Sequence, residues 1–437
     1  MLRRLGKEEV RLGMYIHSLE GPWFDHPFWR SRFLLTDPAD LQAIRDSGIA
    51  GVVVDESKSA GSAAASVQAA RSEFLRQEVQ REAAMAEEPR LVERPRPKPP
   101  RRVAVSVKPA PAPPSEPCSV AEEIDRAAET IERSKRTVAH LLSEVRLGRA
   151  ADVATALPVV EDITASVDRN PHALVSISRM RSKDEYTYYH SISVCALMVN
   201  LARQLDHDEA AVREAGLAGL LHDFGKVVVP DNVLKKAAAL TDFEVAMIRE
   251  HPERGHKAIR ASGYSDVVAD VCLHHHERMD GGGYPHGLKG DEISLQARMA
   301  AVCDVYDAVT SRRPYKAAVG PAQSLAAMFQ SEGHFDGTVL AAFIRSVGIY
   351  PVGSLVRLKS NRLALVIEQA EGDTMRPLVR IFYCIKARAR IPAFDLDLQR
   401  DNEDSIASRE EPVKWGFAAW DSHWAALIRA TPRAAVS

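Results

Sequence analysis

The sequence predicts a multidomain protein, with a helical module between a small α+β N-terminal domain and a β-rich C-terminal extension. The chain has 437 residues, whereas an average domain has roughly 150. A proline-rich stretch at 89–117 separates a short first part from the rest. Beyond Tyr350-Pro351, a helical pattern of apolar residues gives way to short strand-like runs.

The N-terminal domain is predicted at 1–57, where short apolar runs alternate with turn residues. Runs such as 14–16 and 52–54 predict strands, and 40–47 predicts a helix that ends at Gly48. Because both patterns occur within a short stretch, we expect a compact α+β unit.

A linker is predicted at 58–117. Its first part is charged and includes a helical pattern at 66–88, and ten prolines follow between 89 and 117. Proline at this density cannot sustain a helix or a sheet, so this part is expected to be extended and solvated. Seven basic residues against one acidic residue at 89–108 leave open a contact with an anionic partner.

The rest of the chain divides into connecting helices at 118–180, the main helical module at 181–348 and the β-rich extension at 349–437. Within the extension, the strand-like runs are 354–358, 363–368 and 378–384, followed by an irregular acidic stretch and an aromatic tail.

Composition excludes several classes of protein. The 57 basic and 59 acidic residues leave a net charge of −2, which argues against binding of a nucleic acid polymer or an anionic membrane by the whole chain. The five isolated cysteines fit neither a disulfide scaffold nor a zinc ribbon. No apolar segment approaches the roughly 18 residues of a spanning helix, so we expect a cytoplasmic protein without membrane insertion.

A His-Asp pair marks the candidate site. The apolar helical segment that starts at Arg213 meets His222 and Asp223, followed by Gly225 as a left-handed stop and by Lys226. Packing does not explain this pair, because a buried unpaired carboxylate costs several kcal/mol, and a metal ion usually compensates it.

Further ligand-type residues are predicted on successive helices. We expect His190 on a helix at 182–205, and His251 at the end of a helix that begins with a Thr241/Glu244 capping box and stops at Pro252. Taken singly, such histidines are more often core residues or partners of a helix C-terminus than ligands.

The same pattern continues toward the end of the module. His275 and His276 close a helix at 266–277, with His274 as a neighbour on the solvent face. Asp304 lies on an amphipathic helix at 295–312, with Asp307 one turn on. A surface carboxylate is the alternative for Asp304. Together, these side chains are expected to converge on one metal pocket in a helical bundle.

These motifs resemble a known family. They follow one another as His190, His222-Asp223-Phe-Gly-Lys226, His251-Pro, His275-His276-Glu277-Arg, Gly283-Tyr284-Pro285, Asp304-Val-Tyr-Asp307-Ala and Arg313-Pro-Tyr-Lys316. Over 180–348, this succession is similar to the HD-GYP phosphodiesterases, and the Gly-Tyr-Pro loop is its most specific part. The segments 11–15 and 23–28 resemble the small domain that often precedes this module in bacteria.

The resemblance implies an all-α HD-type catalytic module that hydrolyses cyclic di-GMP to pGpG and on to GMP, lowering the level of this second messenger. It implies two divalent metals, iron or manganese rather than zinc, with Asp223 as the bridge. Two metals about 3.5–4 Å apart lower the pKa of a shared water and clamp the phosphoryl group. The implied metal ligands are His190, His222, Asp223 and Asp304 on one side and His251, His275 and His276 on the other.

The resemblance also implies substrate contacts. Asp223 and Lys226 would be catalytic, with Lys226 holding a phosphate oxygen or steadying the leaving group. Arg313 and Lys316 would meet the second phosphate or a guanine edge, although a basic helix end is the alternative for both. For Tyr284, stacking on a base and building the loop are equally open.

Two questions stay open at this stage. The chain could instead be a sensor or adaptor that binds the dinucleotide and acts through signalling partners with little turnover. A third metal, which some family members hold, is not expected, because the position four residues before His190 is Tyr186 and Glu185 is one residue off.

Overall fold

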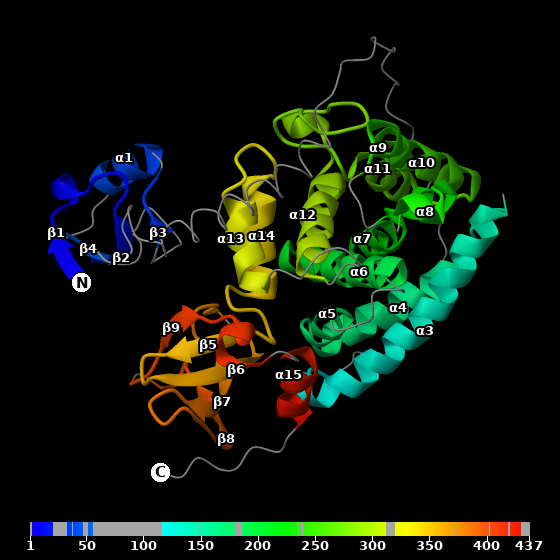
Figure 1. Ribbon diagram of the computed structural model, residues 1–437. Helices are drawn as coiled ribbons and strands as arrows, with labels where there is room; N and C mark the ends of the chain where they lie inside the picture. The colour runs from blue at the N-terminus through cyan, green and yellow to red at the C-terminus, as the bar shows by residue number, and fades with distance from the viewer. Residues whose placement is uncertain are drawn as a thin grey trace. The chain divides into compact units, whose positions relative to one another are not determined.

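The computed structural model describes residues 2–20, 33–36, 38–46, 51–55, 116–147, 149–179, 186–234, 236, 240–311, 320–370, 372–401, 403–417 and 420–429. The chain divides into two compact units, Met1–Ala84 and Met85–Ser437. Figure 1 shows the elements of each unit, with a small sheet in the first and helices followed by a second sheet in the other.

The N-terminal unit holds a four-stranded antiparallel sheet and one helix. The strands are β1 (Leu2–Leu5), β2 (Tyr15–Glu20), β3 (Phe33–Leu34) and β4 (Gly51–Asp55), in the order β1-β4-β2-β3, and the helix is α1 (Pro38–Asp46). Proline suits the first position of α1, because that residue needs no hydrogen-bonded amide. A small core that includes Ile16, Ile44 and Val52 joins helix and sheet, so the expected early α+β region is present.

Helices make up most of the second unit. Their bounds are α3 (Val120–Arg146), α4 (Val153–Arg169), α5 (Ala173–Ser178), α6 (Tyr186–Gln204), α7 (Glu209–Leu221), α8 (Asp231–Leu234), α9 (Asp242–Arg249), α10 (His251–Ala261), α11 (Asp266–His274), α12 (Leu295–Thr310), α13 (Pro321–Phe329) and α14 (Gly337–Val347). The capping box predicted at Thr241 and Glu244 is confirmed at the start of α9. Helix α6 packs against α7 and α12, and these three helices form much of the buried core behind the site.

A second antiparallel sheet follows the helices. Its strands are β5 (Leu355–Leu358), β6 (Arg362–Glu368), β7 (Leu378–Cys384), β8 (Ala389–Asp397) and β9 (Ile406–Arg409), in the order β8-β7-β6-β5-β9, and α15 (Trp420–Arg429) comes after them. The sequence predicted the first three strands. The expectation of an irregular stretch and tail after Cys384 is wrong, because β8, β9 and α15 occupy that part of the chain.

The second sheet shares its core with the helices. Leu363 and Leu365 of β6 belong to the same buried cluster as Ile124 of α3. The backbone amide of Val120 donates to Oε2 of Glu368 at 2.8 Å. The C-terminal sheet therefore packs directly against the first long helix of this unit.

Two further findings concern the cysteines and the helices among the described residues. All five cysteines are free thiols. Among the described helices, none combines the length and the apolar character that a membrane crossing requires.

Candidate metal centre

Five helices bring the seven predicted ligands together. Helix α6 carries His190, α7 ends directly before His222 and Asp223, α10 begins at His251, α11 ends directly before His275 and His276, and α12 carries Asp304. Six of the seven are buried, and His276 is half-buried. The sequence placed these residues at helix ends or inner faces, which is where the structure has them.

One group consists of His190, His222 and Asp304. The Nε2 atom of His190 lies 3.0 Å from Oδ1 of Asp304 and 3.2 Å from Nε2 of His222. Nε2 of His222 is 3.7 Å from the same carboxylate oxygen. The ligand atoms of two imidazoles and one carboxylate therefore converge on one position between α6, α7 and α12.

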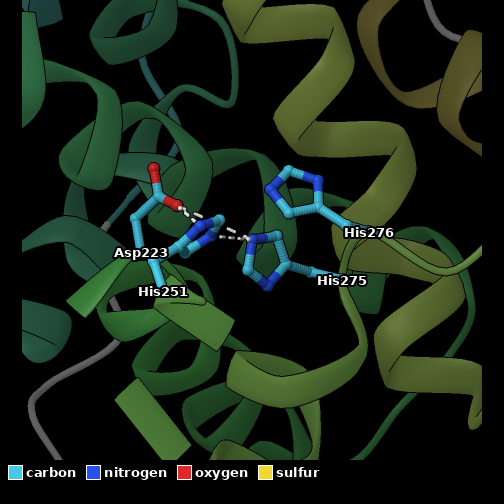
Figure 2. Close-up of side chains that lie close together, drawn as sticks. All are labelled: Asp223, His251, His275 and His276. Carbon is cyan, nitrogen blue, oxygen red and sulfur yellow. Dashed lines mark hydrogen bonds and ion pairs between the residues drawn. The ribbon is translucent and has the colours of Figure 1, made fainter. Parts of the chain in front are cut away.

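The other group consists of Asp223, His251, His275 and His276, and Figure 2 shows these four side chains close together. The Oδ1 atom of Asp223 lies 3.3 Å from Nε2 of His251 and 3.6 Å from Nε2 of His275. The two Nε2 atoms are 3.4 Å apart. The four potential ligand atoms of this group all lie within 4.8 Å of one another.

Asp223 connects the two groups. Its Oδ2 atom lies 3.4 Å from Nε2 of His190 and 3.4 Å from Nε2 of His222, whereas Oδ1 faces His251 and His275. Each carboxylate oxygen thus serves a different set of imidazoles. This is the arrangement that a bridging carboxylate requires.

Three of the histidines, His222, His251 and His275, each direct Nδ1 at a backbone carbonyl oxygen. Nδ1 of His222 lies 2.8 Å from the carbonyl of Gly219, and Nδ1 of His251 lies 2.7 Å from the carbonyl of Ile248. Nδ1 of His275 lies 3.1 Å from the carbonyl of Val271. Since a carbonyl only accepts, Nδ1 must carry the proton and Nε2 presents its lone pair to the centre.

This donor set calls for a cation. Two neutral Nε2 atoms cannot bond to each other, because neither has a hydrogen to donate. The Oδ1 atom of Asp223 is buried and has no hydrogen-bond partner among the described residues. A divalent metal would satisfy both kinds of atom, and imidazole with carboxylate is a common ligand set for transition metals.

Neighbouring charges lower the pKa of Asp223 and raise that of His222. Burial disfavours the charge on Asp223, but Lys226 and His222 outweigh it and hold the pKa of this carboxyl well below its usual range. Burial also disfavours a charged His222, yet Asp223 and Asp304 raise its pKa to about 9. The two carboxylates thus favour positive charge at this point of the centre, as they would favour a bound cation.

Lys226 belongs to the same centre. Its Nζ atom lies 2.6 Å from Oδ2 of Asp223, and its side chain is 25% exposed. It sits in a 3₁₀ turn, Phe224–Val228, that begins directly after Asp223. The ammonium group is thus fixed beside the bridge while part of it stays accessible to a ligand.

Gly225 has a role other than the one expected. It lies inside the 3₁₀ turn, so the predicted left-handed stop is wrong. A Cβ at this position would lie 1.9 Å from the carbonyl oxygen of His251 and 2.6 Å from the amide nitrogen of Gly255. Glycine is therefore required because the turn touches the backbone of α10 at His251.

His251 also differs from expectation. It begins α10 instead of ending the preceding helix, and α9 stops at Arg249. Pro252 does not end a helix here, because it occupies the first turn of α10, where its missing amide costs nothing. The histidine still points inward, since its ring bonds back to Ile248 of α9.

Asp307 is a functional residue that the sequence did not single out. Its Oδ2 atom accepts from Nδ1 of His190 at 2.7 Å, and its Oδ1 accepts from the hydroxyl of Ser311 at 3.1 Å. Helix α12 ends at Thr310 and is buried nearly all round, so the expected amphipathic helix and the alternative of a surface Asp304 are both wrong. The spacing of Asp307 one turn after Asp304 was the available signal.

Glu277 ties the glycine-rich loop to the centre. Its carboxylate accepts from the backbone amides of His286 at 2.7 Å and Leu288 at 3.0 Å. At Gly283, a Cβ would lie 2.4 Å from the Cα of Glu277, so the loop passes too close to neighbouring backbone for a side chain at this position. The loop is thereby held directly beside His276.

Tyr284 lies against the ligands. Its ring stacks on that of His276, with centroids 4.7 Å apart and planes inclined by 23°. Its backbone amide donates to the carbonyl of His276 at 3.2 Å. These contacts give Tyr284 a part in building the loop, and a contact with a ligand stays a prediction.

His274 does not join the centre. Its ring bonds to Oδ1 of Asp270 at 2.7 Å and to Nδ1 of His286 at 3.0 Å. It is half-buried, and its bonds make it a support for the loop. Three further residues, Glu185, Arg313 and Lys316, lie outside the described residues.

Comparison with known proteins adds independent findings. A family model described as an HD domain matches residues 159–339, and one described as a domain of unknown function matches residues 2–156. The chain is 44% identical over 438 residues to a cyclic di-GMP phosphodiesterase of Pseudomonas aeruginosa, covering 99% of this chain and 97% of that protein.

Two shorter matches are also to phosphodiesterases. Over 148 residues, the chain is 42% identical to the cyclic di-GMP phosphodiesterase response regulator RpfG of Xanthomonas campestris pv. campestris, covering 33% of this chain and 39% of that protein. Over 176 residues, it is 31% identical to a 3'3'-cGAMP-specific phosphodiesterase of Vibrio cholerae, covering 40% of this chain and 41% of that protein.

Proposed function

This chain belongs to the HD-domain family of cyclic di-GMP phosphodiesterases, and from this premise we propose how its residues act. It is a phosphodiesterase that hydrolyses cyclic di-GMP. We propose pGpG as the first product and GMP as the product of a second cleavage. The observation that carries the mechanism is the position of Asp223, with one carboxylate oxygen facing each group of histidines.

The proposed metal ligands are the seven residues of the centre. His190, His222 and Asp304 would hold one divalent cation, His251, His275 and His276 the other, and Asp223 both. When bound, such a pair activates a water molecule and neutralises charge on the phosphoryl group. We propose iron or manganese, because both suit a mixed set of imidazole and carboxylate ligands.

The chain's own residues have separate tasks in this proposal. Asp223 holds the two halves of the centre at a fixed separation, and the hydrogen bonds at Nδ1 keep the imidazoles from turning. Lys226, with its ammonium 2.6 Å from Asp223, is placed to hold a phosphate oxygen or to steady the leaving group. Tyr284 would stack on a guanine base.

Arg313 and Lys316 are proposed to bind the second phosphate or a guanine edge. We further propose the domain boundaries given above, with the catalytic module at 181–348 and an input domain at 1–57. A signal received by that domain would reach the catalytic module through other signalling proteins or through the chain itself.

The alternative of a sensor with little turnover is not favoured. The relatives described above are named as phosphodiesterases. A sensor also has no need for a complete set of seven potential metal ligands together with Lys226.

The test is a measurement of metal and turnover on one sample. The full chain would be purified without oxygen, its metals counted by elemental analysis, and its hydrolysis of cyclic di-GMP compared with that of 3'3'-cGAMP. We expect two equivalents of iron or manganese and turnover of cyclic di-GMP that a chelator abolishes. A metal-loaded protein that binds cyclic di-GMP without cleaving it would establish the sensor instead.

A further inference from the structure

Arg249 lies at the edge of the metal centre, and none of the roles described above involves it. It is the last residue of α9, two positions before His251. The central carbon of its guanidinium lies 5.3 Å from the centroid of the Tyr284 ring, and that ring stacks on His276. This cation and a residue of the second histidine group therefore both contact the Tyr284 ring.

The guanidinium of Arg249 has no counter-charge in the described part of the chain. Its Nε atom is buried and has no hydrogen-bond partner there, and no described carboxylate forms an ion pair with it. The next arginine, Arg254, behaves differently, because its Nη2 atom lies 2.6 Å from Oε2 of Glu250 and its side chain is 51% exposed. A half-buried arginine without an anion pays a desolvation cost that only a charged ligand would offset.

Resting on the proposed function, we propose that Arg249 binds the phosphate of cyclic di-GMP that is not being cleaved. Cyclic di-GMP is a cyclic dinucleotide, so two phosphodiester groups form part of its ring. In this proposal, one phosphate lies at the centre beside Lys226, and the other lies farther out, where Arg249 contacts the ring that packs on His276.

Chemistry favours a phosphate over a guanine edge as its ligand. The planar guanidinium donates in a fork that matches two phosphate oxygens. A guanine base is neutral and would leave the charge of Arg249 uncompensated. The contact between the guanidinium and the Tyr284 ring, 5.3 Å from carbon to centroid, also restricts the side chain before the substrate arrives, which lowers the entropy lost on binding.

The test compares a substrate that has two phosphates with one that has a single phosphate. Arg249→Gln should raise the KM for cyclic di-GMP about tenfold to hundredfold, as expected for one charged hydrogen-bonded contact, with kcat changed by less than about threefold. Cleavage of bis(p-nitrophenyl) phosphate, which has only the phosphate that reacts, should change much less. Equal losses on both substrates would overturn the proposal and place Arg249 at the reacting phosphate or in the support of the loop.

Two further variants serve as controls. Arg249→Lys keeps the charge and should recover part of the lost affinity for cyclic di-GMP, whereas a purely structural role through Tyr284 predicts that each variant affects cyclic di-GMP and bis(p-nitrophenyl) phosphate alike. Arg254→Gln removes an exposed arginine nearby and should leave the KM unchanged. If the wild type itself cleaved bis(p-nitrophenyl) phosphate but not cyclic di-GMP, the proposed function would fail. Turnover of cyclic di-GMP with an unchanged KM in Arg249→Gln would reject only this inference.

Discussion

The Nδ1 atom of His190 lies 2.7 Å from Oδ2 of Asp307, one helical turn beyond Asp304 on α12. The same helix therefore supplies a carboxylate to each nitrogen of this ring, since Nε2 faces Asp304 at 3.0 Å. A hydrogen bond of this kind fixes the tautomer of a metal-binding histidine and makes Nε2 a stronger donor to a metal. Asp307 is thus a positioning residue that acts through His190.

We expect Asp307→Ala to weaken metal binding by about ten to a hundredfold, the usual cost of losing such a partner. Activity should return in large part when metal is added in excess, because every direct ligand remains. Titration of the metal-free protein would measure the change. Asp291→Ala is the matched control, since the Asp291 side chain is 99% exposed. Equal affinities in the two variants would mean that Asp307 only fills space in the core.

The residues that converge at the candidate centre were predictable from the sequence, whereas their supports were not. His222 and Asp223 stood out because an apolar helix does not end in such residues without a reason. Asp307 looks the same in the sequence whether it faces water or His190. Its role depends on which face of α12 meets α6, and only the packing of the two helices determines that.

We expect Asp223→Ala to lose bound metal and phosphodiesterase activity together. Its two oxygens face different histidine groups, so removing them breaks both halves of the centre. The fold should survive, because α7 is held by apolar contacts and Lys226 can turn toward solvent. Elemental analysis, turnover and circular dichroism on one preparation would test this. Full metal content with normal turnover would refute the centre as described.

We expect Lys226→Ala mainly to lower kcat and Arg313→Ala mainly to raise the KM for cyclic di-GMP. Lys226 lies beside the bridge at 2.6 Å, where charge changes during the reaction. Contacts that exist only in the transition state appear in kcat, and contacts made equally in the bound substrate appear in KM. Steady-state kinetics at saturating metal would separate the two. A change in KM alone for both variants would show that Lys226 only binds substrate.

Gly225→Ala should disrupt the centre without removing a ligand. The new Cβ would lie 1.9 Å from the carbonyl oxygen of His251, so the turn after Asp223 and the start of α10 must move apart. We expect lower thermal stability and loss of metal. Gly337→Ala is the control, because nothing lies within 4 Å of its Cβ position, and it should be neutral or slightly stabilising. Equal melting temperatures for the two variants would contradict the close approach.

At two places the sequence was ambiguous, because proline is compatible with more than one local structure. Pro252 can end a helix or begin one, and the pattern around His251 fits either, so the position of that histidine was misassigned. Pro392 argues against a strand, yet β8 tolerates it because β8 is an edge strand with one side unpaired.

The number of metals is the remaining prediction. The structure begins α6 at Tyr186, so the residue one turn before His190 is a tyrosine, and Glu185 comes just before the described helix. On a helix, a shift of one residue turns the side chain by about 100°, which would direct Glu185 away from the face that His190 shares with Asp304. Ser182 and Glu185 also have the spacing of a capping box, which would engage the carboxylate in the helix start.

We therefore expect two metals per chain, and we expect Glu185→Gln to leave metal content and activity nearly unchanged, because glutamine still caps the helix. Asp304→Asn is the matched comparison, since it neutralises a carboxylate that lies 3.0 Å from His190 and should lower metal content. Elemental analysis of the three proteins, loaded under the same conditions, decides the matter. Three metals in the wild type that fall to two in Glu185→Gln would show that the helix starts earlier or bends, so that Glu185 reaches the centre.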